Sequence, residues 1–250
     1  MISIKSDREI ELMRCAGLLV SKMHKFIKPY IKEGVTTKEL DRLCEEFILS
    51  NDAVPTEKGY EGYPASICAS VNDTVVHGIP NNYKLKNGDI ITIDVVIGYK
   101  GYQGDAAWTY AVGEIDDDKK YLMEHTEKAL YEGIKMIKPG NRIGDISNAV
   151  ETYATKHKLG VVRELCGHGI GTDMHEEPNV PNFGKPGVGP VLKKGMVICV
   201  EPMLTFGDRH VYMLNDDWTV KTQDGSDAAH YEHTVLVTED GYEILTPRLD

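Results

Sequence analysis

A short phrase that occurs twice constrains how this chain of 250 residues can fold. Residues 86–94 read KNGDIITID, and residues 193–201 read KKGMVICVE. In each copy a Lys and a Gly lead into a mainly apolar five-residue strand pattern, and a carboxylate follows it. A carboxylate at the end of a buried strand loses its hydration, so it needs a charged or polar partner. The two copies predict a cation site between the halves of a duplicated fold.

The duplication extends to the residues that precede each strand pattern. Residues 31–34 (IKEG) match residues 137–140 (IKPG) at an offset of 106, against 107 for the strand phrase. Apolar residues then recur with the spacing of one helix face, at Leu40, Leu43, Cys44 and Phe47 and at Ile146, Ala149, Val150 and Tyr153. Short matches also arise by chance, because helix–turn–helix–strand order is common. Two matches at nearly one offset favour duplication, with halves of about 1–115 and 116–250 in one domain of residues 1–250.

Helix boundaries follow from capping signals. Capping-box spacing predicts helix starts at Ser6 and at Thr36, because a Glu follows each of them three residues later. The first helix is expected to run to about Tyr30. A further helix is expected from about Asp117 and must end before Pro139, since proline cannot continue a helix.

Composition and charge exclude several classes of protein. The chain is 41% hydrophobic and 27% charged, as soluble globular proteins are, and its net charge of −11 disfavours nucleic-acid binding. No apolar run approaches the roughly 18 residues of a membrane span, and the first ten residues lack the apolar core of a secretory signal. The five cysteines are dispersed without a Cys-x-x-Cys motif, as free thiols are. We therefore expect a cytoplasmic protein with no membrane or nucleic-acid partner.

Two further acids join the pair that ends the repeated phrases. Asp105 follows Asp94 by eleven residues, and a hairpin with its loop at residues 99–101 would place both on adjacent strands. Glu232 lies 31 residues after Glu201, within residues 230–237, a run that we interpret as one more strand. Four carboxylates in one pocket raise one another's pKa values unless cations neutralise them. The pattern predicts two divalent ions.

His168 is the histidine that best completes this set. Glycines flank it on both sides, and the helical His-Glu-x-x-His zinc signature is absent from the sequence. Four carboxylates and one imidazole form an oxygen-rich set that favours manganese, iron or cobalt, with zinc left open. Taken singly, each residue has a simpler interpretation: a lone histidine is usually structural, Asp94 could cap a turn, and Glu232 could be an exposed strand acid. The set as a whole favours a metal centre.

These residues resemble those of the type I methionine aminopeptidases over nearly the whole chain. Residues 166–175 (CGHGIGTDMH) are similar to the histidine motif of that family. Its five metal ligands have counterparts in order and spacing at Asp94, Asp105, His168, Glu201 and Glu232. The resemblance implies an α+β pita-bread fold, in which two pseudo-twofold-related halves form a curved antiparallel sheet with outer helices.

The resemblance also implies a role for each ligand. Asp94 would hold one metal ion, and Asp105 and Glu232 would bridge the two ions. His168 and Glu201 would complete the coordination of the second ion. Glu201 would also carry a proton to the leaving nitrogen. The two divalent ions would be cobalt, manganese, iron or zinc.

Family positions around the substrate have counterparts as well. His77 matches a histidine near the substrate amide, and His175 matches one that contacts the substrate carbonyl. The residues that match the lining of the methionine pocket are Tyr60, Tyr63, Cys68 and Trp218. Two residues depart from the family pattern. Met174 stands where an aromatic residue is expected and would soften that wall, and Glu57 lies near a position that is usually apolar or cysteine. We expect Glu57 to face solvent.

The implied activity is metal-dependent removal of the N-terminal methionine from nascent proteins whose second residue is small. The implied setting is a cytoplasmic monomer that meets methionine-terminated peptides and nascent chains, with transient contact to the ribosome.

Three alternatives remain. An Xaa-Pro aminopeptidase or dipeptidase of the same fold usually has an extra N-terminal domain, for which this chain has no room. A non-catalytic pita-bread peptide-binding module loses metal ligands, and the third alternative is an αβ domain without metal. The interval from Glu201 to Glu232 also has no room for the helical insertion of the type II enzymes.

Overall fold

The computed structural model describes residues 2–249, which form four α-helices and fifteen strands. The helices are α1 (Asp7–Ile27), α2 (Thr37–Ser50), α3 (Asp117–Ile134) and α4 (Ile143–Lys156). The first strands are β1 (Val54–Pro55), β2 (Cys68–Val71), β3 (Thr74–Val76), β4 (Ile90–Tyr99) and β5 (Tyr102–Ala111). The others are β6 (Gly160–Val161), β7 (Gly167–Gly169), β8 (Glu176–Val180), β9 (Val197–Val200), β10 (Met203–Thr205), β11 (Val211–Met213), β12 (Val220–Thr222), β13 (Ala228–His230), β14 (His233–Val237) and β15 (Tyr242–Ile244).

The predicted helix starts are confirmed by their caps. At the start of α1, the backbone N–H of Ser6 donates to the carboxylate of Glu9 at 2.7 Å. At the start of α2, the Thr36 hydroxyl accepts the backbone N–H of Glu39 at 3.1 Å. A 3₁₀ turn follows α1 and ends at Tyr30, so the first helical run has the expected length. The third helix begins at Asp117 as predicted.

The helix faces predicted from the repeat are confirmed position by position. Leu40 and Cys44 in α2 are fully buried, and so are Ile146 and Val150 in α4. The intervening pairs are partly buried in both helices, Leu43 with Ala149 and Phe47 with Tyr153. Corresponding residues are therefore buried to a similar extent, because both helices pack the same apolar face against the strands.

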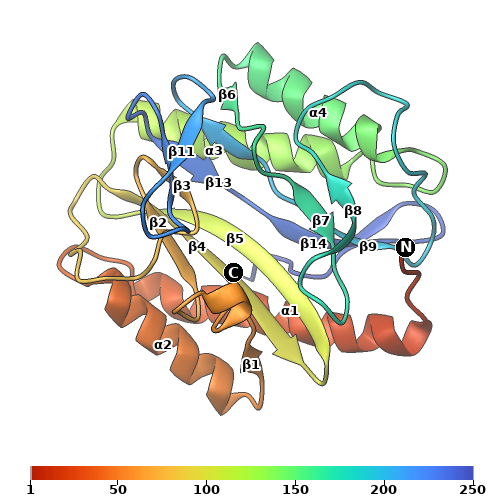
Figure 1. Cartoon of the computed structure of the whole chain (residues 1–250), viewed down its shortest axis with the longest axis horizontal. Helices are drawn as coiled ribbons and strands as arrows, with labels where there is room; N and C mark the ends of the chain where they lie inside the picture. The colour runs from red at the N-terminus through yellow and green to blue at the C-terminus, as the bar shows by residue number, and fades with distance from the viewer. Residues whose placement is uncertain (1, 250) are drawn as a thin grey trace.

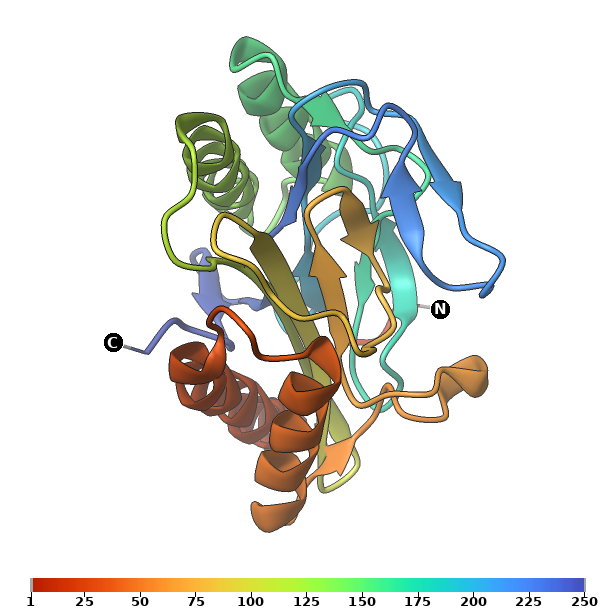
Figure 2. The same ribbon diagram turned by 90° about the vertical axis from the view of Figure 1, so that its left-hand side faces the viewer.

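The helices cover one side of the strands, with α1 and α2 toward one end and α3 and α4 toward the other (Figure 2). One hydrophobic core lies under α1 and α2 and includes Ile93 of β4. A second core lies under α3 and α4 and includes Ile198 of β9. The division of one domain into halves of about 1–115 and 116–250 stays a prediction. None of the helices within residues 2–249 has the length and apolar character that crossing a membrane requires.

The first copy of the repeated phrase differs from its prediction. β4 does not end at Asp94 but continues to Tyr99 and pairs with β5 along its whole length (yellow in Figure 1). The strand continues because Val95, Val96 and Ile97 are buried apolar residues that extend the pairing. The hairpin turn lies at Lys100 and Gly101, where both residues have positive φ, as a tight two-residue turn requires. In the second copy, β9 ends directly before the acid, as predicted.

The single strand predicted for residues 230–237 is in fact two strands. β13 pairs with β10, and β14 pairs with β9, so the chain changes partners at Tyr231 and Glu232. At this change, the backbone N–H of Glu232 donates to the Ala107 carbonyl of β5 at 2.8 Å. The Thr234 hydroxyl also donates to the Asp105 carbonyl at 2.8 Å. These bonds join β5 to the strands of the other core. All strand pairs within residues 2–249 are antiparallel.

Candidate active site

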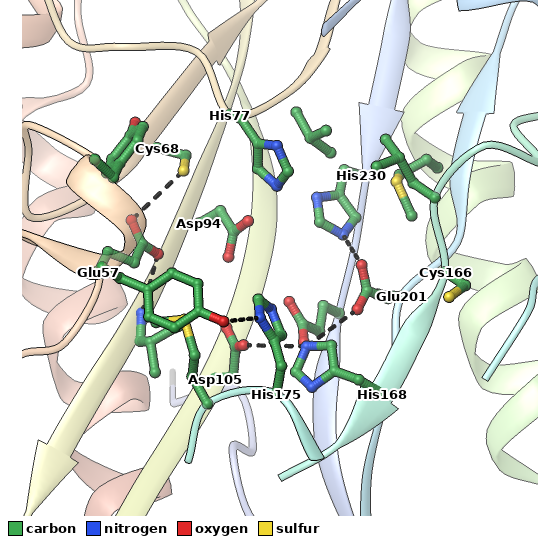
Figure 3. A pocket seen from close by; sticks show the side chains of 18 of the residues that line it. Glu57, Cys68, His77, Asp94, Asp105, Cys166, His168, His175, Glu201 and His230 are labelled. Carbon is green, nitrogen blue, oxygen red and sulfur yellow. Dashed lines mark hydrogen bonds and ion pairs between the residues drawn. The ribbon is translucent and has the colours of Figure 1, made fainter. Parts of the chain in front are cut away.

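A cavity of about 610 Å³ lies among the strands, and the residues singled out from the sequence line its wall (Figure 3). They are Tyr60, Tyr63, Cys68, His77, Asp94, Asp105, His168, Met174, His175, Glu201, Trp218 and Glu232. These residues lie in separate stretches of the chain between residues 60 and 232, on both sides of its midpoint. The fold therefore brings together the whole set that sequence patterns selected.

Strand register aims the four carboxylates at one place. Asp94 pairs with Ala107, and Val96 pairs with Asp105, so the two aspartates lie diagonally on the same face of the β4–β5 hairpin. Glu201 directly follows β9, and Glu232 directly precedes β14. Because Val200 pairs with His233 in these antiparallel strands, the two glutamates flank adjacent ends of the pair.

Burial makes this carboxylate cluster costly without a cation. Burial raises the pKa of Asp94 to about 7. It also raises the pKa values of Asp105, Glu201 and Glu232 well above normal, and neighbouring carboxylates add to the effect. Among residues 2–249, neither Asp105 Oδ1 nor Glu232 Oε1 has a hydrogen-bond donor, although both atoms are buried. Buried oxygens without donors are what divalent cations need as ligands, so the set fits a metal centre.

The tautomer of His168 supports the same fit. Its Nδ1 lies 2.9 Å from the Gly169 carbonyl, which only accepts hydrogen bonds, so Nδ1 carries the proton. Nε2 therefore carries a lone pair, and this atom lies 3.4 Å from Glu201 Oε1 and 3.7 Å from Asp105 Oδ2. Burial lowers the pKa of His168 to about 4, which keeps the ring neutral. A lone pair that faces ionised carboxylate oxygens is unfavourable, and a cation between them would remove this repulsion.

The predicted pocket residues form an aromatic wall beside the acids. The Tyr63 hydroxyl donates to the carbonyls of Ile67 and Gly78, and its ring meets Trp218 edge-on with ring centroids 5.0 Å apart. The Tyr60 hydroxyl lies 3.0 Å from His175 Nδ1. Figure 3 shows His77 and His175 extending toward the carboxylates. Met174 is buried at the cavity wall, where the softening we expect from it stays a prediction.

The prediction that Glu57 faces solvent is wrong. Its side chain is 7% exposed and lines the cavity. Its Oε1 accepts the backbone N–H of Val96 at 3.2 Å, and the Cys68 thiol lies 3.5 Å from Oε2. The cause is a contact between distant segments. The backbone N–H of Thr56 donates to the Val96 carbonyl and so extends the short pairing of β1 with β4, and the side chain of the next residue, Glu57, then points inward. Burial raises the pKa of Glu57 well above normal, and nearby Asp94 adds to this effect.

Two more residues of the site carried no recognised signal. His230 lines the cavity at 1% exposure, and neither of its ring nitrogens has a hydrogen-bond partner within the described chain. The sign available in the sequence was its spacing of two from Glu232 next to a strand. The buried Cys199 thiol lies close to Asp105, His168 and Glu232, with one possible ligand atom of each residue within 4.8 Å of the others. Burial raises the pKa of Cys199 well above normal, so it remains a thiol.

Comparison with known proteins identifies the family of the chain. The model of metallopeptidase family M24 matches residues 11–239, and the chain belongs to this family. Methionine aminopeptidase 1 of Bacillus subtilis is 51% identical over 98% of this chain and 99% of its own length. The methionine aminopeptidase of Escherichia coli is 44% identical over 100% of this chain and 95% of its own length. Within family M24, the chain thus falls among the methionine aminopeptidases.

Solved structures agree with this placement. The crystal structure of methionine aminopeptidase from Rickettsia prowazekii superposes with a TM-score of 0.98 at 44% identity, covering 99% of this chain and 100% of that one. The prolidase from Pyrococcus horikoshii superposes with a TM-score of 0.79 at 22% identity, covering 98% of this chain and 64% of that one. The second match shows a shared fold alone. The predicted α+β pita-bread fold is confirmed.

Proposed function

We propose that this protein removes the N-terminal methionine from nascent proteins whose second residue is small, with two divalent metal ions at its centre. The observation that carries the proposal is the convergence of four carboxylates, three of them buried, and the His168 lone pair on one cavity, with two buried carboxylate oxygens left without donors in residues 2–249. The relatives above, named as methionine aminopeptidases, support the substrate.

Each ligand has a place in this proposal. Asp94, Asp105, His168, Glu201 and Glu232 would hold the two ions. When bound, such ions polarise a carbonyl and lower the pKa of a coordinated water toward neutrality. The oxygen-rich set suits cobalt, manganese or iron, and zinc is also accommodated.

The side chains of the protein position the substrate and move its protons. Glu201, whose pKa is raised by burial and by Asp105, accepts a proton from the attacking water and returns it to the leaving nitrogen. His175 donates from Nε2 to the substrate carbonyl when the Tyr60 hydroxyl donates to its Nδ1. His77, held with φ of +57°, faces the substrate amide.

The pocket selects the side chain of the first residue. Tyr60, Tyr63 and Trp218 offer aromatic surfaces, and sulfur–aromatic contacts favour a flexible thioether. Cys68 and Met174 complete the wall that we assign to methionine. A peptide whose first residue is methionine is therefore the substrate class that the pocket fits.

We further propose that the protein works as a monomer in the cytoplasm and meets nascent chains transiently at the ribosome. Its five cysteines are free thiols, of which Cys44, Cys68 and Cys199 are buried, and this usage fits a reducing compartment.

The decisive experiment compares two peptide classes with metal-stripped protein. We expect release of free methionine from Met-Ala-Ser only after one of the divalent ions is added back, and no cleavage of Xaa-Pro peptides. Free methionine is measured by mass spectrometry for each ion in turn. Release that resists a chelator, or cleavage of Xaa-Pro peptides in preference to Met-Ala-Ser, would overturn the proposal.

Glu57 provides a test of the pocket itself. Replacing Glu57 with Leu makes the wall apolar, so we expect the ratio of kcat/KM for methionine over glutamine at the first position to rise by about 10-fold. Glu57→Gln keeps a polar wall and should retain the wild-type ratio. Glu46→Leu, on the exposed face of α2, serves as a control. An unchanged ratio in Glu57→Leu would place this carboxyl beyond the reach of the substrate.

A further inference from the structure

The carboxylate of Glu201 lies between two imidazole rings. Its Oε1 is 3.4 Å from His168 Nε2, and its Oε2 is 3.7 Å from His230 Nε2. Figure 3 shows the two rings on either side of this carboxylate, with His230 nearer to His77. Each carboxylate oxygen thus has one imidazole nitrogen as its neighbour.

The two imidazoles cannot perform the same task. His168 must present a lone pair to Glu201, because its only ring proton is committed to the Gly169 carbonyl. His230 is not committed at either nitrogen, since neither has a hydrogen-bond partner among residues 2–249. Either tautomer is therefore available to His230, and the one with its proton on Nε2 presents a donor to Glu201 Oε2.

The burial of His230 indicates that this donor is used. The ring is 1% exposed, so water does not satisfy it from outside, and a buried polar side chain with no partner is rare in folded proteins. The 3.7 Å separation exceeds a normal hydrogen bond by about 0.5 Å, so the two side chains must approach each other by that amount for the bond to form. Carboxylates that ligate metals are commonly held by a hydrogen bond to their second oxygen.

We propose that His230 is a positioning residue: its Nε2–H donates to Glu201 Oε2 and holds Oε1 toward His168 and the cation site. The inference rests on the metal centre of the proposed function. It assigns different tasks to the two oxygens of Glu201: Oε1 would join His168 in holding a cation, and Oε2 is anchored by His230. Loss of the anchor loosens a ligand and misplaces the group that moves the proton.

The test measures metal binding apart from catalysis. Titration calorimetry with Mn²⁺ on metal-stripped protein should show affinity about 10- to 100-fold weaker in His230→Ala than in wild type. His230→Gln restores an N–H donor near Oε2, and we expect affinity within about 3-fold of wild type by the same reasoning. With saturating Mn²⁺, kcat for Met-Ala-Ser should fall in His230→Ala, while KM stays near the wild-type value.

A nearby histidine offers a matched control. His233 is equally buried, but its nitrogens lie 3.1 Å from the Thr246 hydroxyl and 3.2 Å from the Tyr131 hydroxyl. His233→Gln should therefore leave Mn²⁺ affinity unchanged even where it lowers thermal stability. Wild-type affinity in His230→Ala overturns the inference, and so does a His230→Gln variant as weak as His230→Ala. If wild type binds Mn²⁺ with the expected order among variants but releases no methionine, the proposed function fails and the positioning role stands.

Discussion

Replacing Glu201 with Gln lowers the turnover of Met-Ala-Ser by about 10³-fold, the scale of a lost proton-transfer group. The amide keeps the size of the side chain but cannot accept the proton of the attacking water. It also removes one negative charge beside His168, whose Nε2 lies 3.4 Å from Glu201 Oε1. Single-turnover release of methionine, measured at saturating peptide and metal, reports this loss directly.

The fold of the Glu201→Gln variant should survive, because burial already raises the pKa of this carboxyl well above normal in the metal-free protein. A neutral amide removes that electrostatic cost, so we expect the melting temperature of the stripped variant to equal or exceed that of stripped wild type. Glu164→Gln is the matched control, since Glu164 lines the cavity but is exposed at its rim. Near-normal turnover in Glu201→Gln would remove this residue from proton transfer.

The helices could be predicted from the sequence because their signals are local. The Ser6 and Thr36 caps depend on residues three positions away, and the faces of α2 and α4 follow from helical spacing alone. The site residues could be selected because metal ligands combine residue type with order along the chain. Their convergence was predicted from the repeat, and the cavity contains them all.

The remaining features depend on contacts between distant segments. The strand that carries Asp94 continues because Val95 to Ile97 find partners in β5, and the strand near Glu232 breaks because the chain changes partners there. Glu57 turns inward because the Val96 N–H meets its carboxyl. The position of His230 also depends on such contacts, because its neighbours along the chain do not determine which side of the strand it faces. Sequence spacing alone does not contain these pairings.

Removal of the metal ions makes the stability of this protein fall as the pH rises toward and through 7. Asp94 has a pKa of about 7 when folded without metal, against 3.8 as its ordinary value. A carboxyl with a raised folded pKa stabilises the fold fully below its unfolded pKa, and this contribution is lost as the pH rises through the folded pKa. The pKa values of Asp105, Glu201 and Glu232 are raised in the same direction, so these carboxyls add to the loss.

Buried histidines act in the opposite direction, but in a lower range of pH. Burial lowers the pKa of His24 and of His233 from 6.5 to about 3 in the folded protein. Between these two values, the unfolded protein therefore binds more protons than the folded protein. That effect destabilises the folded protein as the pH falls below 6.5, and it fades above 7. The window from pH 7 to 8, which begins at the folded pKa of Asp94, therefore reports the carboxylates more than the histidines.

Bound cations should abolish this pH dependence, because they keep the carboxylates ionised and neutralised in the folded protein. In that window, each carboxyl that retains its proton when folded contributes about 1.4 kcal/mol per pH unit. That energy corresponds to about 3 °C in Tm for a chain of this size. Scanning calorimetry should show the Tm of stripped protein falling with pH while that of Mn²⁺-loaded protein stays level. Parallel curves for the two forms would mean that the four carboxylates do not share a cation site, and the metal assignment of the whole cavity would be withdrawn.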